Sequence, residues 1–256
     1  MNKLIMHPAD FRITDTIRSM QKITLLVARK FNRWTGGTIP FNKAEKLIAK
    51  LDRQYGILAS EEHQRTLREK GLARCRLIMG FDGAIDNQRL WWIMLVSDTG
   101  TGSVVEQEEL HLATDKRNRI KVMGYELVHY PKPRFPGAED SRNGPTWTWR
   151  VPADHWKEHR EHLIALARHQ SVRQAQKAVD DEYKRPGFRG LREQRMELFR
   201  AMEKAREPLV ANGAEPIVFR KHLPHLRILR QGDEHTLTIK ELMTLEMEAR
   251  PTSQRL

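Results

Sequence analysis

The stretch Leu90-Trp91-Trp92-Ile93-Met94-Leu95-Val96 is a continuous apolar run near the middle of the chain. Such a run is typical of a β-strand that is buried on both faces of a sheet. Strand-like segments also occur at 74–81, 119–130 and 147–151, and turns or loops separate the successive segments. These short or loop connections favour antiparallel pairing. We therefore predict a mostly antiparallel four-stranded central sheet.

Helical patterns flank this sheet on both sides. Apolar residues recur at helical spacing in the segments before and after it. Gly36-Gly37 is expected to end the first helix, and Pro208 is expected to end the last of the long helices. The fold class is therefore α+β, with N-terminal and C-terminal basic helices around the sheet and a small C-terminal hairpin plus helix. Helices are predicted at 10–34, 42–55, 60–71, 154–183 and 189–207, and the third of them is short.

These patterns divide the chain into four segments. A basic helical arm spans 1–72, the central β-sheet region spans 73–151, and a second basic helical arm spans 152–213. The C-terminal hairpin and helix occupy 214–256. The four segments could also pack as one compact domain, because 256 residues lie near the upper end of the usual domain size.

The net charge of +12 is unevenly distributed along the chain. Residues 1–75 hold 15 Lys/Arg and 7 Asp/Glu, a net +8, and residues 152–230 hold 17 and 11, a net +6. Residues 76–151 are neutral, with 10 of each sign. A balance of this kind indicates a polyanionic partner, and nucleic acid is the partner that fits best. Ordinary solvated faces of basic helices are the alternative.

Three groups of basic residues are the predicted contacts. The densest group surrounds the turn Pro186-Gly187-Phe188, a second lies in the Pro- and Gly-rich loop 131–145, and a third closes the first helix. Contacts from such groups to phosphates are independent of base sequence and strongly salt-sensitive. The residues in question are Lys184, Arg185, Arg189, Arg192 and Arg195, then Lys132, Arg134 and Arg142, then Arg29, Lys30 and Arg33.

Two tryptophans in the last predicted strand are further candidates. Trp147 and Trp149 alternate with threonine, which places both indoles on one face of a strand. They could serve as stacking platforms for bases. Packing of the sheet against the helices is the interpretation we prefer for both residues.

Helix 60–71 has a clear start at Ser60, which can cap it, and Glu61 and Glu62 suit its positive end. With the two helices before it, this segment could form a helix-turn-helix whose reading helix is Ser60–Lys70. A plain helical hairpin is preferred.

The single cysteine, Cys75, excludes an intramolecular disulfide, and a buried structural thiol is preferred over a reactive thiolate.

The sequence offers little sign of catalysis. His155 and His159 are spaced i, i+4 and could share a transition metal, but a polar helix face is preferred, so no metal or cofactor is predicted. A metal-dependent nuclease using Asp82, Asp98 or Glu126 stays an alternative. No Gly-Lys-Ser/Thr motif follows a glycine-rich loop, and no relaxase-type histidine pair occurs.

The spacing of the apolar and tryptophan motifs carries one resemblance. Trp91-Trp92, Gly124-Tyr125-Glu126-Leu127-Val128, Thr146-Trp147-Thr148-Trp149-Arg150 and Arg185-Pro186-Gly187-Phe188-Arg189-Gly190 resemble uncharacterised proteins borne on proteobacterial plasmids and integrative conjugative elements. The resemblance covers about residues 40–200. It implies a bacterial mobile-element setting, in which handling DNA is common, so DNA is favoured over RNA.

The predicted function is that of a DNA-binding accessory protein of a mobile element, with no enzymatic activity. A protein-interaction subunit of a larger nucleoprotein assembly is the alternative, in which other protein subunits are the partners. No apolar run is long enough to span a membrane and no secretory signal is evident, so a cytoplasmic location without a membrane partner is expected.

Overall fold

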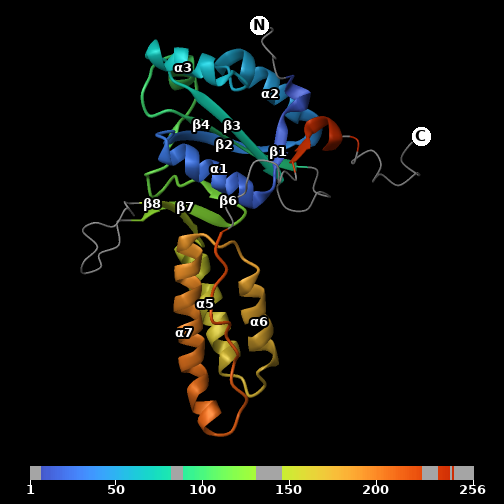
Figure 1. Ribbon diagram of the computed structural model, residues 1–256, viewed down its shortest axis with the longest axis vertical. Helices are drawn as coiled ribbons and strands as arrows, with labels where there is room; N and C mark the ends of the chain where they lie inside the picture. The colour runs from blue at the N-terminus through green and yellow to red at the C-terminus, as the bar shows by residue number, and fades with distance from the viewer. Residues whose placement is uncertain (1–6, 82–88, 131–145, 227–235, 243, 245–256) are drawn as a thin grey trace. The chain divides into compact units, whose positions relative to one another are not determined.

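The computed structural model describes residues 7–81, 89–130, 146–226, 236–242 and 244. The chain forms two compact units: unit 1 comprises Met1–Met123 and Arg230–Leu256, and unit 2 comprises Gly124–Leu229. The predicted α+β class and the four-stranded antiparallel sheet are confirmed (Figure 1). The boundary between the units falls inside the segment 73–151, so the predicted strands do not all belong to one sheet.

The four-stranded sheet lies in unit 1, in the order β3-β4-β2-β5. β4 is central and pairs antiparallel with both β3 and β2, while β5 extends the other side of β2. Two of the predicted strands, 74–81 and 90–96, are therefore in this sheet, and its other two strands were not predicted. The strands span Cys75–Phe81 (β3), Arg89–Val96 (β4), Arg33–Pro40 (β2) and His111–Leu112 (β5).

Both faces of β4 are covered, as the apolar run predicts. Leu90 and Met94 join a core with α2 (Phe41–Tyr55) on one face, and Trp91, Ile93 and Leu95 on the other face are also buried. Helix α1 (Thr16–Ala28) packs against β3 and β4, and its buried residues lie outside the α2 core. Since α1 and α2 cover opposite faces (Figure 1), the three N-terminal helices do not form the three-helix bundle of a helix-turn-helix.

The expectation that Gly36-Gly37 ends a helix is wrong, because both glycines lie within strand β2. A Cβ atom at Gly36 would lie 2.5 Å from the carbonyl oxygen of Trp92, and one at Gly37 would lie 3.5 Å from the Trp92 indole nitrogen. Glycine within a strand commonly marks such a close approach of a neighbouring chain. Gly36 therefore lets β2 pack tightly against β4, whereas a Cβ atom at Gly37 would make only an ordinary van der Waals contact.

The predicted helix 10–34 is also corrected at its start. Arg12–Thr14 forms strand β1, which pairs antiparallel with β9 (Thr236–Thr238) from the other end of the chain. Asp15 then caps α1 by accepting a hydrogen bond from the backbone nitrogen of Arg18 at 3.0 Å. The predicted hairpin turn 231–234 lies outside the described residues.

The remaining elements of unit 1 are short. Ser60 caps α3 as predicted, since its side chain accepts from the backbone nitrogen of His63, and the left-handed Gly56 ends α2. The other elements are η1 (Pro8–Asp10), α3 (Glu61–Glu69), α4 (Ser103–Gln107) and β6 (Lys121–Val122).

Unit 2 combines a pair of β-strands with three long helices. Strands β7 and β8 are antiparallel, and the helices share a core around Leu163, Val179 and Leu198. The predicted helix 154–183 is two helices, and Pro208 lies inside α7 instead of ending it. The elements are β7 (Tyr125–Tyr130), β8 (Thr146–Arg150), α5 (Ala153–Ala167), α6 (Arg173–Tyr183) and α7 (Arg189–Ala211).

The predicted strand 119–130 is interrupted. Met123 and Gly124 both have left-handed backbone conformations, with φ of 48° and 80°. Two successive residues of this kind reverse the chain direction in a tight turn. The interruption separates β6 of unit 1 from β7 of unit 2.

None of the helices in the described part of the chain has both the length and the apolar character that a membrane span requires.

Candidate nucleic-acid interface

The four strands of the unit 1 sheet share one row of residues at one end. The strand registers pair Leu112 with Arg33, Arg33 with Val96, and Val96 with Cys75. This row contains the first residues of β2 and β3 and the last residues of β4 and β5. Segments that are far apart in the sequence, which enter or leave the strands here, therefore meet at this end of the sheet.

The turn between α1 and β2 holds the predicted basic residues Arg29, Lys30 and Arg33 at this end. The Asp98 carboxylate accepts hydrogen bonds from the backbone nitrogen and the side-chain Nδ2 of Asn32, both at 2.8 Å. The backbone nitrogen of Asp98 donates to the backbone carbonyl of Lys30 at 2.8 Å, and Arg33 Nη2 donates to the Asp98 carbonyl at 2.6 Å. Arg29 and Lys30 are exposed, so this anchored turn presents their charges to solvent.

Arginines from α3 and β3 continue the positive surface. The guanidinium of Arg74 lies over the Phe31 ring, 4.8 Å from its centroid. Phe31 directly follows Lys30 in the chain, so Arg74 lies beside the turn that carries Arg29 and Lys30. Burial and the guanidiniums of Arg68 and Arg76 lower the pKa of Arg74. Neither Arg68 nor Arg74 forms an ion pair with a carboxylate of the described residues.

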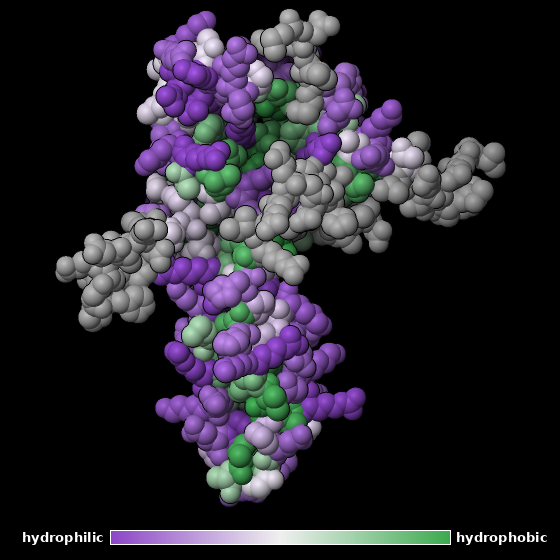
Figure 2. Space-filling model, in the orientation of Figure 1, coloured by the Kyte–Doolittle hydropathy of each residue, from purple (hydrophilic) through white to green (hydrophobic). Residues whose placement is uncertain are grey.

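These arginines border a pocket. Its volume is about 390 Å³. The exposed α3 surface beside it is mainly hydrophilic (Figure 2). The residues that line it are Glu61, Gln64, Arg65, Arg68 and Arg74.

A basic loop completes the surface on the β5 side. The backbone nitrogen of Ala113 donates to the carbonyl of Asn32 at 2.7 Å, and Trp34 Nε1 donates to the carbonyl of Asn118 at 3.0 Å. These two bonds fix the loop after β5 beside the start of β2. The loop exposes Lys116 and Arg117.

We call this surface the basic end of unit 1. Two of its carboxylates form ion pairs, Glu61 with Arg76 at 2.6 Å and Glu69 with Arg65 at 3.0 Å. Asp115 accepts hydrogen bonds from its own loop, and these bonds lower its pKa. The basic end is defined by Arg29, Lys30, Arg33, Arg65, Arg68, Arg74, Arg76, Lys116 and Arg117.

The densest cluster predicted from the sequence lies in unit 2, and most of its charge is neutralised locally. Carboxylates lie 2.6 Å from the amine of Lys184 and 2.8 Å from the Nε atoms of Arg185 and Arg189. Arg192 Nη1 lies 2.9 Å from Nδ1 of His225. The partners are Asp181, Glu182 and Glu193, in that order.

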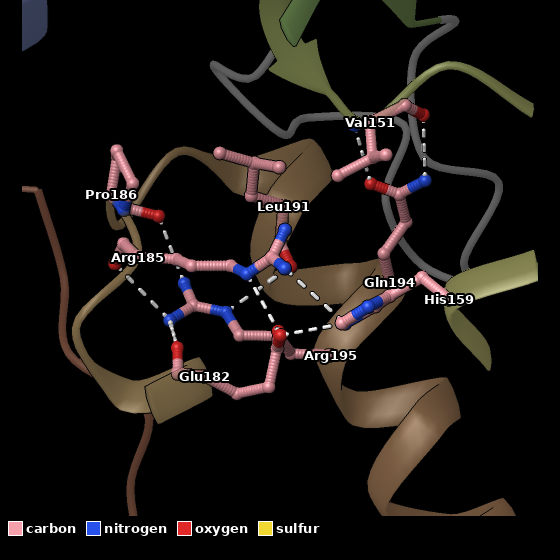
Figure 3. A network of polar contacts seen from close by, with 8 residues as sticks. All are labelled: Val151, His159, Glu182, Arg185, Pro186, Leu191, Gln194 and Arg195. Carbon is pink, nitrogen blue, oxygen red and sulfur yellow. Dashed lines mark hydrogen bonds and ion pairs between the residues drawn. The ribbon is translucent and has the colours of Figure 1, made fainter. Parts of the chain in front are cut away.

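Arg195, a member of that predicted cluster, is only 1 % exposed, and its assignment as a phosphate contact is corrected. Its guanidinium donates to the carbonyls of Glu182 and Pro186, both at 2.9 Å, and to those of Arg185 and Leu191, both at 3.3 Å (Figure 3). Burial lowers the pKa of Arg195. The side chain ties the end of α6 and the following turn to α7, so its role is structural.

The histidine pair proposed for a metal does not converge on one point. His155 is exposed, whereas His159 Nε2 lies 2.7 Å from the Glu182 carboxylate and 3.2 Å from Arg185 Nη2. If Nε2 of His159 carries a hydrogen, it donates to the Glu182 carboxylate. If it carries none, its lone pair accepts a hydrogen bond from the Arg185 guanidinium, which can only donate. Either state leaves no lone pair on Nε2 for a metal ion. Among the described residues, no group of three or more metal-binding side chains occurs.

The two candidate tryptophans differ. Trp149 is fully buried and packs 6.4 Å from the Phe188 ring, so it belongs to the core of unit 2, as preferred above. Trp147 is half-buried beside the His129 ring at 4.9 Å. Lys132, Arg134 and Arg142 lie outside the described residues.

The carboxylates suggested for a nuclease are occupied where they are described. Asp98 is bound by Asn32, and Glu126 pairs with Arg150 at 2.7 Å. Asp82 lies outside the described residues.

Cys75 is buried, and burial raises the pKa of its thiol to about 12. We predict that iodoacetamide at pH 9 leaves Cys75 of the native protein unmodified, since the thiol stays protonated and inaccessible. The same reagent should label the urea-unfolded chain, whose ordinary cysteine pKa is about 8.5. Mass spectrometry measures both, and rapid labelling of the native chain would contradict the burial.

Comparison with protein-family models, with curated proteins and with solved structures finds no match for this chain.

Proposed function

We propose that this chain is a DNA-binding protein that contacts the phosphate backbone through the basic end of unit 1. One observation supports this most strongly: basic side chains from three separate segments meet along one end of a single sheet. The exposed cations there outnumber the carboxylates. The choice of DNA rests on the resemblance to proteins of mobile elements, and membership of such an element stays a prediction.

The geometry favours backbone contact over base reading. The cations belong to a turn, a loop, the side of a short helix and the start of a strand. Contacts of this kind hold a protein on DNA through phosphates, and each one releases counterions. Binding should therefore be weakly dependent on sequence and steeply dependent on salt.

The test is a triple variant, Arg29→Gln, Lys116→Gln and Arg117→Gln. All three side chains are exposed and none forms an ion pair with a carboxylate of the described residues, so the fold should be retained. The slope of log K against log salt for a random-sequence DNA duplex should fall in magnitude by about 2 to 3, at ~0.9 per phosphate contact. Fluorescence anisotropy across a salt series measures this slope.

The matched control is Lys43→Gln, Lys46→Gln and Lys50→Gln in α2, which removes the same charge from exposed positions outside the basic end. The control should bind DNA like the unchanged protein. Equal losses in both variants would show that only net charge matters and would contradict the assigned surface. Binding of RNA in preference to DNA would contradict the choice of DNA, and the absence of binding to either would overturn the proposal.

A further inference from the structure

We propose that the pocket between α3 and the start of β3 binds a terminal phosphate of a DNA strand. This inference rests on the proposed function and adds a specific ligand to one part of the basic end. The pocket is lined by Arg65, Arg68 and Arg74, together with Gln64 and Glu61. It lies beside β3, the edge strand of the sheet, where the basic end stops.

The charge in the pocket suits a dianion. Arg65 pairs with Glu69 only through an exposed ion pair, which is weak and easily exchanged. Arg68 and Arg74 form no ion pair with a carboxylate of the described residues. Burial and the like charge of Arg68 lower the pKa of Arg74, and the nearby Glu61 carboxylate acts in the opposite direction. A terminal phosphomonoester carries about −1.5 to −2 at pH 7, whereas each internal phosphodiester carries a single negative charge. Three guanidiniums around one pocket therefore favour the strand end.

A polar atom in the same pocket lacks a partner. Gln64 is 2 % exposed, and its Nε2 donates to the Gly56 carbonyl at 3.2 Å, which fixes the orientation of the amide. Its Oε1 is buried and accepts no hydrogen bond from the described residues. A buried acceptor is ordinarily satisfied by a donor. A dianionic phosphate has no hydrogen to donate, and Oε1 is shielded from solvent, so the phosphate would bind through the three arginines and not through Gln64.

Position also favours a strand end. The pocket lies beyond the last strand of the sheet, and buried Gln64 lines it. A strand that follows the basic end toward α3 would finish with its terminal phosphate among these arginines.

The test compares short DNA strands that carry an internal fluorophore and differ only at one end: a 5′-phosphate, a 3′-phosphate or hydroxyls at both ends. At 150 mM salt, a phosphorylated strand should bind about tenfold more tightly than the hydroxyl strand, as one added charge-assisted contact implies. Inorganic phosphate should compete with the phosphorylated strand more strongly than with the hydroxyl strand.

The variant Arg65→Gln/Arg68→Gln should reduce that preference to about one, because exposed α3 side chains supply most of the contact. The matched control Lys43→Gln/Lys46→Gln should keep the preference. Equal binding of phosphorylated and hydroxyl strands would overturn the terminal site but leave the proposed DNA binding intact. A preference that survives the Arg65/Arg68 change would place the phosphate elsewhere and overturn this pocket, and the absence of binding by all strands would overturn both proposals.

Discussion

Replacement of Arg195 by methionine should lower the free energy of unfolding of unit 2 by about 3 to 5 kcal/mol, because several buried carbonyls each lose a charged donor at about 1 to 3 kcal/mol. The guanidinium is 1 % exposed and donates to four backbone carbonyls. Methionine fills similar volume but donates nothing. The carbonyl of Glu182 at the end of α6 and those of Arg185 and Pro186 in the following turn would lose this donor.

Two variants separate this cause from simple loss of charge. Arg195→Lys keeps the charge, but a single ammonium cannot reach carbonyls on both sides, so it should recover only part of the loss. Arg200→Met removes an exposed arginine from the same helix and should change stability by no more than about 0.5 kcal/mol. Urea unfolding, followed by hydrogen exchange of peptides from unit 2, gives the three values. A stability loss for Arg195→Met equal to that for Arg200→Met would show that the buried network contributes nothing.

The same variant also distinguishes the two interpretations of Arg195. From the sequence, Arg195 is one of several arginines near a helix start and therefore a predicted phosphate contact. In the structure it is buried, so Arg195→Met should leave the salt dependence of DNA binding unchanged at temperatures where unit 2 stays folded. A run of arginines along a helix does not reveal which one turns inward, because backbone carbonyls of another segment decide it.

Local patterns predicted the elements well where the signal itself is local. The apolar run 90–96, the cap Ser60 and the helix predicted at 42–55 all appear as expected. Strand β1 was predicted as part of a helix, and β9 was predicted as part of a local C-terminal hairpin. Both predictions were wrong about the pairing, because β1 and β9 pair with each other across more than two hundred residues. Strand β2 was missed because Gly36-Gly37 has the composition of a turn.

The candidate site was only partly predictable for a similar reason. Arg29, Lys30 and Arg33 were predicted contacts, and the structure places them in the middle of the basic end. Lys116 and Arg117 were not predicted, since they lie in the segment whose net charge is zero. A net charge summed along the sequence conceals cations that the strand registers bring beside another basic segment.

The second large effect is expected at Gly80 of β3, opposite Trp91 of β4. A Cβ atom at Gly80 would lie 2.3 Å from Cζ2 and 2.7 Å from Cε2 of the Trp91 indole. The indole is 7 % exposed and lies in the core, so it has little room to move. Gly80→Ala should therefore destabilise unit 1 by about 3 kcal/mol, at the upper end of ordinary overpacking.

A double-mutant cycle tests whether the indole is the cause. Trp91→Leu removes the atoms that clash and will itself lower stability, because it leaves space in the core. In the Trp91→Leu background, the added cost of Gly80→Ala should fall below about 1 kcal/mol, so that the two changes couple strongly. Chemical unfolding of the four proteins, read by hydrogen exchange of β3 and β4 peptides, measures the coupling. If Gly80→Ala lowers the free energy of unfolding equally in both backgrounds, its effect comes from the strand backbone. The close packing of Gly80 on Trp91 is then not what holds these two strands together.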